Sequence, residues 1–226
     1  MSRRRMGGLQ SGQEAIVTST GVFISIIATL MLGAMSPGPS FVVVSRIAIS
    51  RSRLDGLAAA LGMGLAGVIF SILALAGLTA VLTKFTWLYI VLKIGGGAYL
   101  IYIAASIWKG ARQPLAIAAA GQAERSLARS FSTAFATQIS NPKTVIVYAS
   151  IFAALLPKSV PLGLMLCLPV GVFAVEAGWY TLVALAFSSR RPRQLYLAAK
   201  AWIDRTAGTV MAALGLRLAL SGLIGR

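Results

Sequence analysis

Histidine is absent from this chain of 226 residues, cysteine occurs once, and only five residues are acidic. Without histidine, metal sites built on His and Cys spacing and a Ser–His–Asp catalytic set are both excluded. Cys167 cannot form an intramolecular disulfide, and its apolar surroundings are typical of a small buried or lipid-facing residue. We therefore expect no metal, no cofactor and no catalytic residue. An intramembrane protease or a lipid transferase stays open as an alternative, although Ser36 lacks an evident base.

Charged residues are also scarce, at 12% of the chain, against about 25% in an ordinary soluble domain. Hydrophobic residues make up 58%, and the mean hydropathy is +0.83. These values place the chain among membrane proteins, with the lipid bilayer as a partner. The net charge of +16 would suggest nucleic-acid binding in a soluble protein. Because the basic residues lie mostly between apolar runs, membrane topology explains them better, and we expect no nucleic-acid partner.

Six apolar runs follow a basic polar tail at residues 1–14, which we expect to be disordered or to lie on a surface. At about 20 residues per span, each run is long enough to cross a bilayer. The alternative of a cleaved signal peptide ending near Ser36 is disfavoured because the apolar run continues past that point. A polar connection at 109–130 divides the chain into halves 15–108 and 131–226. The runs cover about 15–45, 57–82, 85–108, 131–156, 162–187 and 206–224.

Two proline motifs interrupt these runs: Ser36-Pro37-Gly38-Pro39 in the first and Asn141-Pro142-Lys143 in the fourth. Proline removes a backbone donor and clashes with the preceding turn, so neither run can be one regular helix. Backbone groups freed at membrane depth are tolerated only where they face protein or a water-filled cavity. Paired breaks in corresponding positions of two halves point to a transporter's binding site. We predict that all seven residues contribute to a substrate site between the broken spans.

The fold class we predict is an all-α membrane protein with six transmembrane helices in two inverted three-helix repeats, the first and fourth helices being broken. An odd number of spans per half makes the second half enter the bilayer from the opposite side. Twelve Lys and Arg residues lie on one side of the predicted topology and six on the other. By the positive-inside rule the richer side is cytoplasmic, which places both termini outside.

Glu176 is the only acidic residue deep within a predicted span. Ionisable residues in such places are costly and usually face the bundle interior or a cavity. Glu176 is suited to bind and release a proton, or to pair with a substrate ammonium group. The alternative is a fixed ion pair with Lys143, Lys93 or Arg217.

Three of the candidate site residues can each have two different roles. Lys143 can attract a substrate carboxylate or extend to an interface. Asn141 can cap the half-helix that follows it and also donate to a ligand. Tyr180 lies four residues after Glu176 on the same helix face, where its hydroxyl can reach the carboxyl group or the substrate; the alternative is an amphipathic residue of the core. Small residues in the second span let helices approach closely, and they permit a homodimer without requiring one.

The ordered set of motifs resembles the lysine exporter (LysE/RhtB) family of amino-acid translocators, over about residues 20–224. The resemblance implies an inner-membrane exporter of amino acids or close derivatives, driven by an ion gradient. The chain departs from many relatives at Gly67, where they carry an acidic residue in the second span. Its absence makes Glu176 the stronger candidate for proton coupling. It also disfavours a doubly cationic substrate such as lysine. Besides the two proline motifs, the residues that carry the resemblance are Arg46, Gly56-Leu57, Lys93 to Leu100, Glu176 with Trp179-Tyr180, and Gly215 to Leu220.

We interpret the chain as a multi-pass secondary transporter of the bacterial inner membrane that exports amino acids, with protons as the expected coupling ion. In this interpretation the half-helix ends and Asn141 hold the substrate carboxylate, and Glu176 takes the ammonium group or the coupling proton. Two alternatives remain: a passive channel or facilitator for small polar solutes, and a non-transporting accessory subunit of the membrane.

Overall fold

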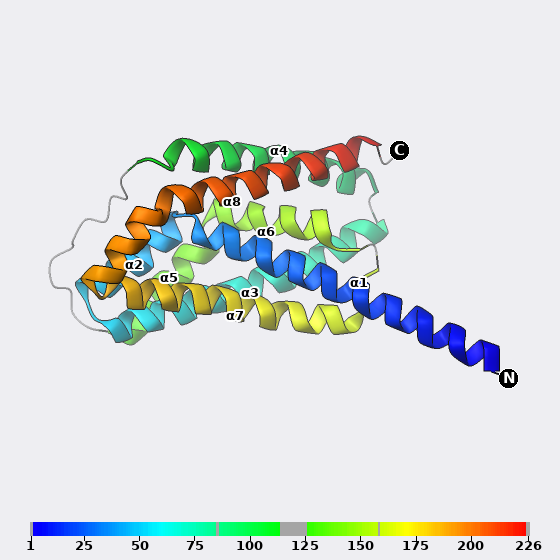
Figure 1. The fold of residues 1–226 in the computed structure, drawn as a ribbon, viewed down its shortest axis with the longest axis horizontal. Helices are drawn as coiled ribbons and strands as arrows, with labels where there is room; N and C mark the ends of the chain where they lie inside the picture. The colour runs from blue at the N-terminus through cyan, green and yellow to red at the C-terminus, as the bar shows by residue number, and fades with distance from the viewer. Residues whose placement is uncertain (1, 85, 114–125, 158, 225–226) are drawn as a thin grey trace.

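The computed structural model describes residues 2–84, 86–113, 126–157 and 159–224, and within these ranges it contains eight α-helices and no strand. They form one elongated bundle, in which the start of the first helix and the end of the last lie at the same end (Figure 1). The helices are α1 (Ser2–Met35), α2 (Pro39–Ser50), α3 (Arg53–Lys84), α4 (Thr86–Gly110), α5 (Leu127–Ile139), α6 (Pro142–Leu155), α7 (Leu162–Phe187) and α8 (Arg190–Ile224).

The two proline motifs break the helices where the sequence predicts. α1 ends at Met35 and α2 begins at Pro39, with a bend of 61° between them. α5 ends at Ile139 and α6 begins at Pro142. Both prolines occupy the start of their helix, where the missing N–H group would have no intrahelical partner in any case.

Three helices in the described ranges are long and apolar enough to cross a membrane, over Arg53–Gly77, Leu162–Phe187 and Gln194–Leu223. The bent pair α1–α2 makes a fourth if it is counted as one span, and α6 is a shorter apolar helix. The chain is thus an all-helical membrane protein. Its arrangement as six spans in two inverted repeats stays a prediction.

Three segments differ from the sequence expectation. Residues 2–14, expected to be a disordered or surface-lying tail, continue α1, which extends beyond the rest of the bundle (Figure 1). Residues 188–204, expected to be a connection, are mostly helical because α8 begins at Arg190. The long connection after α4 ends earlier than expected because Ser126 caps α5, accepting a hydrogen bond from the Arg129 N–H.

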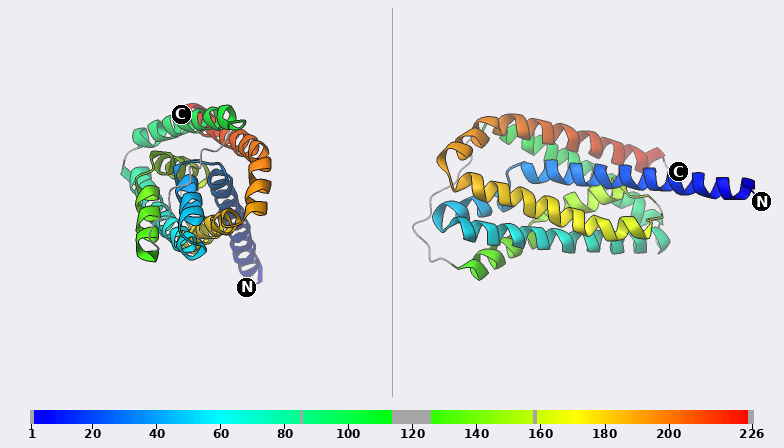
Figure 2. Two further views of the ribbon diagram at one scale, coloured as in Figure 1. Left: turned by 90° about the vertical axis from the view of Figure 1, so that its left-hand side faces the viewer. Right: turned by 60° about the horizontal axis from the view of Figure 1, so that its bottom comes forward.

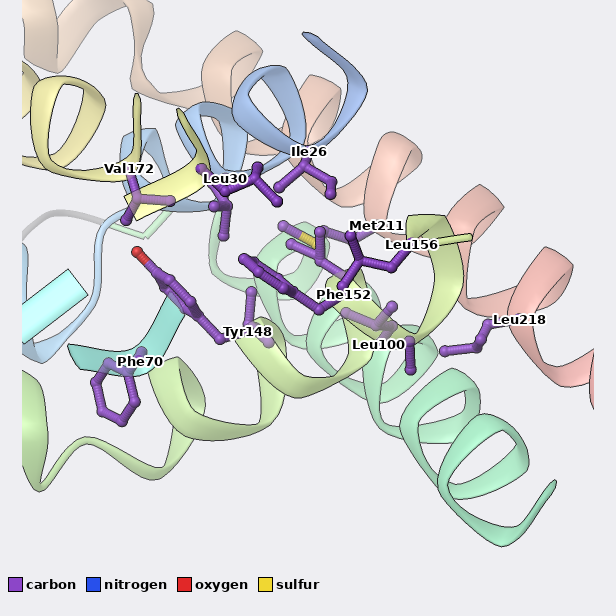
Figure 3. Packing of buried hydrophobic residues seen from close by; sticks show 14 of the residues in the cluster. Ile26, Leu30, Phe70, Leu100, Tyr148, Phe152, Leu156, Val172, Met211 and Leu218 are labelled. Atoms are coloured by element: carbon purple, nitrogen blue, oxygen red, sulfur yellow. The ribbon is translucent and has the colours of Figure 1, made fainter. Parts of the chain in front are cut away.

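Apolar side chains fill the bundle in two clusters, one on each side of the helix breaks. The larger cluster joins α1, α3, α4, α6, α7 and α8, and includes Ile26, Leu100 and Phe152 (Figure 3). The second surrounds α2 and includes Phe41 and Met63. Seen along the helices, α2 lies near the centre of the bundle, with α4 and α8 along one edge (Figure 2). The broken segments therefore lie in the interior, between two packed regions.

Glycines bring neighbouring helices close together, as predicted for the small residues of the second span. A Cβ atom on Gly62 would lie 2.5 Å from the Phe131 carbonyl oxygen of α5, and one on Gly64 would lie 2.8 Å from the Ala177 Cβ of α7. In the same way a Cβ on Gly215 would lie 2.6 Å from the Gly97 carbonyl oxygen, so α4 and α8 are also in close contact. These contacts lie within the chain.

Candidate functional site

A small cavity lies where both broken helices meet α7. Its volume is about 40 Å³, enough for one or two water molecules. Small-molecule pockets are usually about 300–1,000 Å³, so this conformation is closed to an amino acid. The cavity is lined by Leu30, Gly33, Ala34, Ser36, Gly38, Ser40, Phe41, Gln138, Asn141, Lys143, Thr144, Val147, Tyr148, Glu176 and Tyr180.

Glu176 reaches this cavity from the middle of α7 and is only 3% exposed. Both of its carboxylate oxygens accept hydrogen bonds from neutral groups. The Tyr148 hydroxyl of α6 donates to Oε1 at 2.8 Å, and the Gln138 side-chain amide of α5 donates to Oε2 at 3.3 Å. Among the described residues no Lys or Arg side chain forms an ion pair with Glu176, and Arg217 is exposed on α8. The fixed ion pair considered as an alternative is therefore absent from this conformation.

A chain of hydrogen bonds connects Glu176 to the two helix breaks. Gln138, which donates to Glu176, accepts from the Ser40 hydroxyl of α2 through its Oε1 atom. The Asn141 side-chain amide donates to the same Ser40 oxygen at 3.1 Å. One network thus joins α2, α5, the second break and α7, and all of its side chains are buried.

The two half-helices differ in how their first N–H groups are satisfied. Asn141 caps α6, because its Oδ1 accepts from the Lys143 N–H at 3.0 Å, which confirms the predicted capping role. Gly38 precedes α2 and provides no side-chain cap. The first N–H groups of α2 therefore stay available to a ligand or to water, at the positive end of the helix dipole.

The predicted site residues do not all line this cavity. Ser36, Gly38, Asn141, Lys143, Glu176 and Tyr180 do, whereas Pro37 and Pro39 line a neighbouring cleft and Pro142 is exposed at the start of α6. Tyr180 is buried, but the tyrosine recorded as donating to Glu176 is Tyr148.

Sequence reasoning missed Ser40, Gln138 and Tyr148. Neutral polar side chains in apolar runs are common, and nothing in their spacing connects them to Glu176. The one available signal was position, since Ser40 directly follows the first proline motif and Gln138 lies three residues before Asn141. In the described part of the chain no group of three or more His, Cys, Asp and Glu side chains could hold a metal ion.

Gly67 of α3 lies directly beside this network. A Cβ atom on Gly67 would lie 3.0 Å from the Tyr148 hydroxyl and 3.1 Å from the Glu176 Cγ atom. Any longer side chain at this position would have to displace Glu176 or its hydrogen-bond donor. The glycine therefore leaves Glu176 as the acidic group of the cavity.

The chain matches the family model for LysE type translocators over residues 31–222. It is 32% identical over 206 residues to the threonine efflux protein of Escherichia coli K12, which covers 88% of this chain and 98% of that protein. The threonine efflux protein of Salmonella typhi is also 32% identical, over 207 residues and with the same coverage. An uncharacterized membrane protein of Haemophilus influenzae is 26% identical, covering 89% of this chain and 98% of that protein. No solved structure matches.

Proposed function

We propose, from the fact that this chain belongs to the LysE type translocator family, that it exports a small neutral amino acid such as threonine across the bacterial inner membrane. The family is one of membrane translocators and not of enzymes. Its relatives named as threonine efflux proteins support an amino acid as the substrate. A proton gradient drives export in this proposal.

The observation that carries the proposal is the buried network of Ser40, Gln138, Asn141 and Glu176. It connects both helix breaks to the one acidic group of a cavity that is closed in this conformation. A passive channel needs a continuous path, whereas an alternating-access transporter passes through a closed state. A cavity too small for an amino acid is what such a transporter shows in one of its states, and dependence of export on the proton gradient separates it from a channel.

In the substrate-bound state we assign the α-carboxylate to the start of α2, where N–H groups are left without a side-chain cap. Lys143 lines the same cavity and adds a positive charge near Gly38. Glu176 lies at the other end of the network, and it takes the α-ammonium group or the coupling proton. Cationic groups of the site then lie near the carboxylate and the acidic group near the ammonium.

Helix contacts support the inverted repeat of six spans. If α1 to α4 correspond to α5 to α8, equivalent pairs should make equivalent contacts. α1 contacts α7 as α5 contacts α3, and α2 contacts α7 as α6 contacts α3. The equivalent helices α3 and α7, and likewise α4 and α8, pack directly on each other. A two-fold axis in the membrane plane would produce these shared contacts. The reciprocity is partial among the described residues, because α2 contacts α3 and α4 contacts α6 without comparable contacts of α6 with α7 or of α2 with α8.

The basic connections support the proposed orientation. Arg51 donates to the Ser130 hydroxyl at the start of α5, and Lys200 of α8 donates to the Gly110 carbonyl oxygen at the end of α4. The end of α2, the end of α4 and the starts of α5 and α8 lie at one end of the bundle (Figure 1). We place this end in the cytoplasm and both termini outside. A homodimer stays a prediction, because the close contacts of Gly62, Gly64 and Gly67 in α3 all lie within the chain.

The test of this function is amino-acid export from cells loaded with mixed dipeptides. We expect the wild type to release threonine faster than cells with empty vector, and Asn141→Ala to lose most of this release. Asn141→Asp is the matched control, because an aspartate keeps the helix cap but cannot donate to Ser40. If Asn141→Asp is stable and also loses export, the amide is required for transport and not only for capping.

Two outcomes would contradict the proposal. Release that does not change when the proton gradient is collapsed would indicate a passive facilitator. Reconstituted protein that moves no amino acid, but that copurifies with a stable partner, would indicate an accessory subunit.

A further inference from the structure

A second and larger cavity lies next to the central one. It is a cleft of about 420 Å³ that follows α4 from Tyr99 to Gln113, just beyond the end of this helix. At 1.5 Å per residue this is a path of about 20 Å from the middle of the bundle to its basic end. Ser36, Gly38 and Lys143 line both cavities, so the cleft and the central cavity share one wall.

Asp204 of α8 lines this cleft and is only 3% exposed. Its Oδ2 atom accepts a hydrogen bond from Lys200 at 2.8 Å. Its Oδ1 atom is buried and accepts no hydrogen bond from any described residue. A buried carboxylate oxygen without a hydrogen-bond donor is energetically costly. A ligand that donates a hydrogen bond to Oδ1 would remove this cost.

Lys200 is already occupied and is not the cation that a ligand would meet. Its ammonium group donates to the Gly110 carbonyl at 2.9 Å as well as to Asp204. Lys143 is the other cation of the cleft, and its Nζ atom lies 3.5 Å from the position of a Cβ on Gly38. The cleft thus contains one acidic group with a free oxygen and one basic group at the helix break.

We infer that this cleft is an entry site for the amino-acid substrate, in which Asp204 binds the α-ammonium group and Lys143 binds the α-carboxylate. The inference rests on the proposed export function. Because the Oδ1 atom is shielded from solvent in this conformation, the proposal requires the Asp204 side chain to turn toward the cleft when the ammonium group binds. Lys143, on the shared wall, then holds the carboxylate as the substrate moves to the central cavity. Tyr99, Ser106 and Gln113 offer neutral polar groups to the substrate side chain.

The experiment compares Asp204→Asn with Lys200→Met in proteoliposomes. It measures the uptake of threonine down its concentration gradient. Both variants break the same ion pair, but only the first removes the carboxylate. We expect Asp204→Asn to raise the KM for threonine about tenfold or more, because it removes a charge-assisted contact with the substrate. We expect Lys200→Met to leave the KM unchanged or lower, because it frees the carboxylate.

N-acetylthreonine, which lacks the ammonium group, provides a second readout. The wild type should be inhibited far better by threonine than by N-acetylthreonine, and Asp204→Asn should lose most of this preference. A role of Asp204 that is limited to holding Lys200 against the end of α4 would not change this ratio. If Asp204→Asn does not purify as a folded protein, the double variant Asp204→Asn/Lys200→Met replaces it, since it leaves no buried charge unpaired.

The possible failures are distinguishable. If the wild type transports threonine and both single variants reduce the rate equally with an unchanged KM, Asp204 only holds Lys200 against α4 and the entry site is wrong, while export stands. If the wild type moves no amino acid in the same assay, the export function fails, and the entry site fails with it.

Discussion

Glu176 is held by two neutral donors, a tyrosine hydroxyl and a glutamine amide. A neutral environment lets a carboxyl group change its protonation state without breaking an ion pair, which a coupling residue must do in each transport cycle. A fixed Lys or Arg partner would instead keep it charged. The chemistry of its neighbours is therefore consistent with proton coupling.

The variant Glu176→Gln tests this role. The glutamine side chain has nearly the same shape, and its oxygen can still accept from Tyr148, but it cannot titrate. We expect it to retain exchange of labelled threonine across proteoliposome membranes and to lose uphill transport driven by a pH gradient. Tyr148→Phe serves as a control, because it removes a donor and leaves the carboxyl group in place. Uphill export by Glu176→Gln at the wild-type rate over the whole pH range would show that another group carries the proton.

The variant Gly67→Ala tests the space beside the same network. Its new Cβ atom would lie 3.0 Å from the Tyr148 hydroxyl, so the neighbours must shift. Overpacking of this kind costs about 1–3 kcal/mol, and here it displaces the donor to Glu176. We expect a lower midpoint of thermal unfolding in detergent and a lower export rate.

Gly77→Ala is the matched control for this change. It lies on the same helix, and its Cβ would meet nothing within 4 Å. Because alanine is the better helix former, this control should leave unfolding unchanged or raise its midpoint. Equal effects of both substitutions would show that Gly67 has no special relation to the site.

At the level of elements, the sequence is most informative where several residues that disfavour a helix lie together. The breaks before Pro39 and Pro142 were predictable because proline disfavours a helix interior and stands there beside glycine or asparagine, whereas α7 continues through the isolated Pro169. The start of α8 was not predictable, because its charged residues read as a solvated connection. In the structure Lys200 and Asp204 pair with each other one turn apart and are buried. Charge alone does not tell whether a side chain faces water or a partner.

The same limit applies to the site. Glu176 and Asn141 were predictable because an acid deep in a span and an asparagine before a proline are unusual in themselves. Gln138 and Tyr148 are ordinary residues of their helices, and they contact Glu176 only because α5 and α6 bring them to α7. Contacts between residues 28 or more positions apart depend on the packing of whole helices, which a single sequence does not specify.

Asp55 joins two helix starts that come from different halves of the chain. It is 1% exposed, and its carboxylate accepts from the Ser126 N–H at 3.1 Å and the Ser130 hydroxyl at 2.8 Å, both at the start of α5. It also accepts from Ser52, whose hydroxyl in turn accepts from the Asp55 N–H at 3.1 Å and so caps α3. This side chain thus fixes the basic ends of α3 and α5 to each other.

The variant Asp55→Ala should therefore destabilise the fold without touching the cavity. Each buried donor left without an acceptor costs about 1–3 kcal/mol. We expect a clear decrease in the midpoint of thermal unfolding, followed by tryptophan fluorescence. Ser52→Ala is the control and should cost only about 1 kcal/mol, the usual value of a helix cap. A midpoint equal to that of the wild type would mean that the link between α3 and α5 contributes nothing to stability.

For the whole molecule, the central question is whether α5 and α6 together cross the membrane or return to the side they left. α5 begins at Leu127 at the basic end, and α6 ends at Leu155 toward the opposite end of the bundle (Figure 1). At 1.5 Å per residue, α5 and α6 laid end to end would extend about 40 Å, against a hydrocarbon core of about 30 Å, and the angle between them (Figure 1) shortens this extent. An inverted repeat requires the pair to cross the membrane once. A re-entrant pair would leave the second half of the chain with one span fewer than the first.

Cysteine labelling decides between these arrangements. In a Cys167→Ser background, Gln113→Cys lies before α5 and Gly163→Cys follows α6, and both positions are exposed. If the pair crosses once and the basic end is cytoplasmic, a membrane-impermeant maleimide should label Gly163→Cys in intact cells. It should label Gln113→Cys only after the membrane is permeabilised. Labelling of both positions under the same condition would make α5 and α6 re-entrant and would rule out two inverted three-helix repeats. Labelling in the reversed order would keep the repeat and invert the orientation, placing both termini in the cytoplasm.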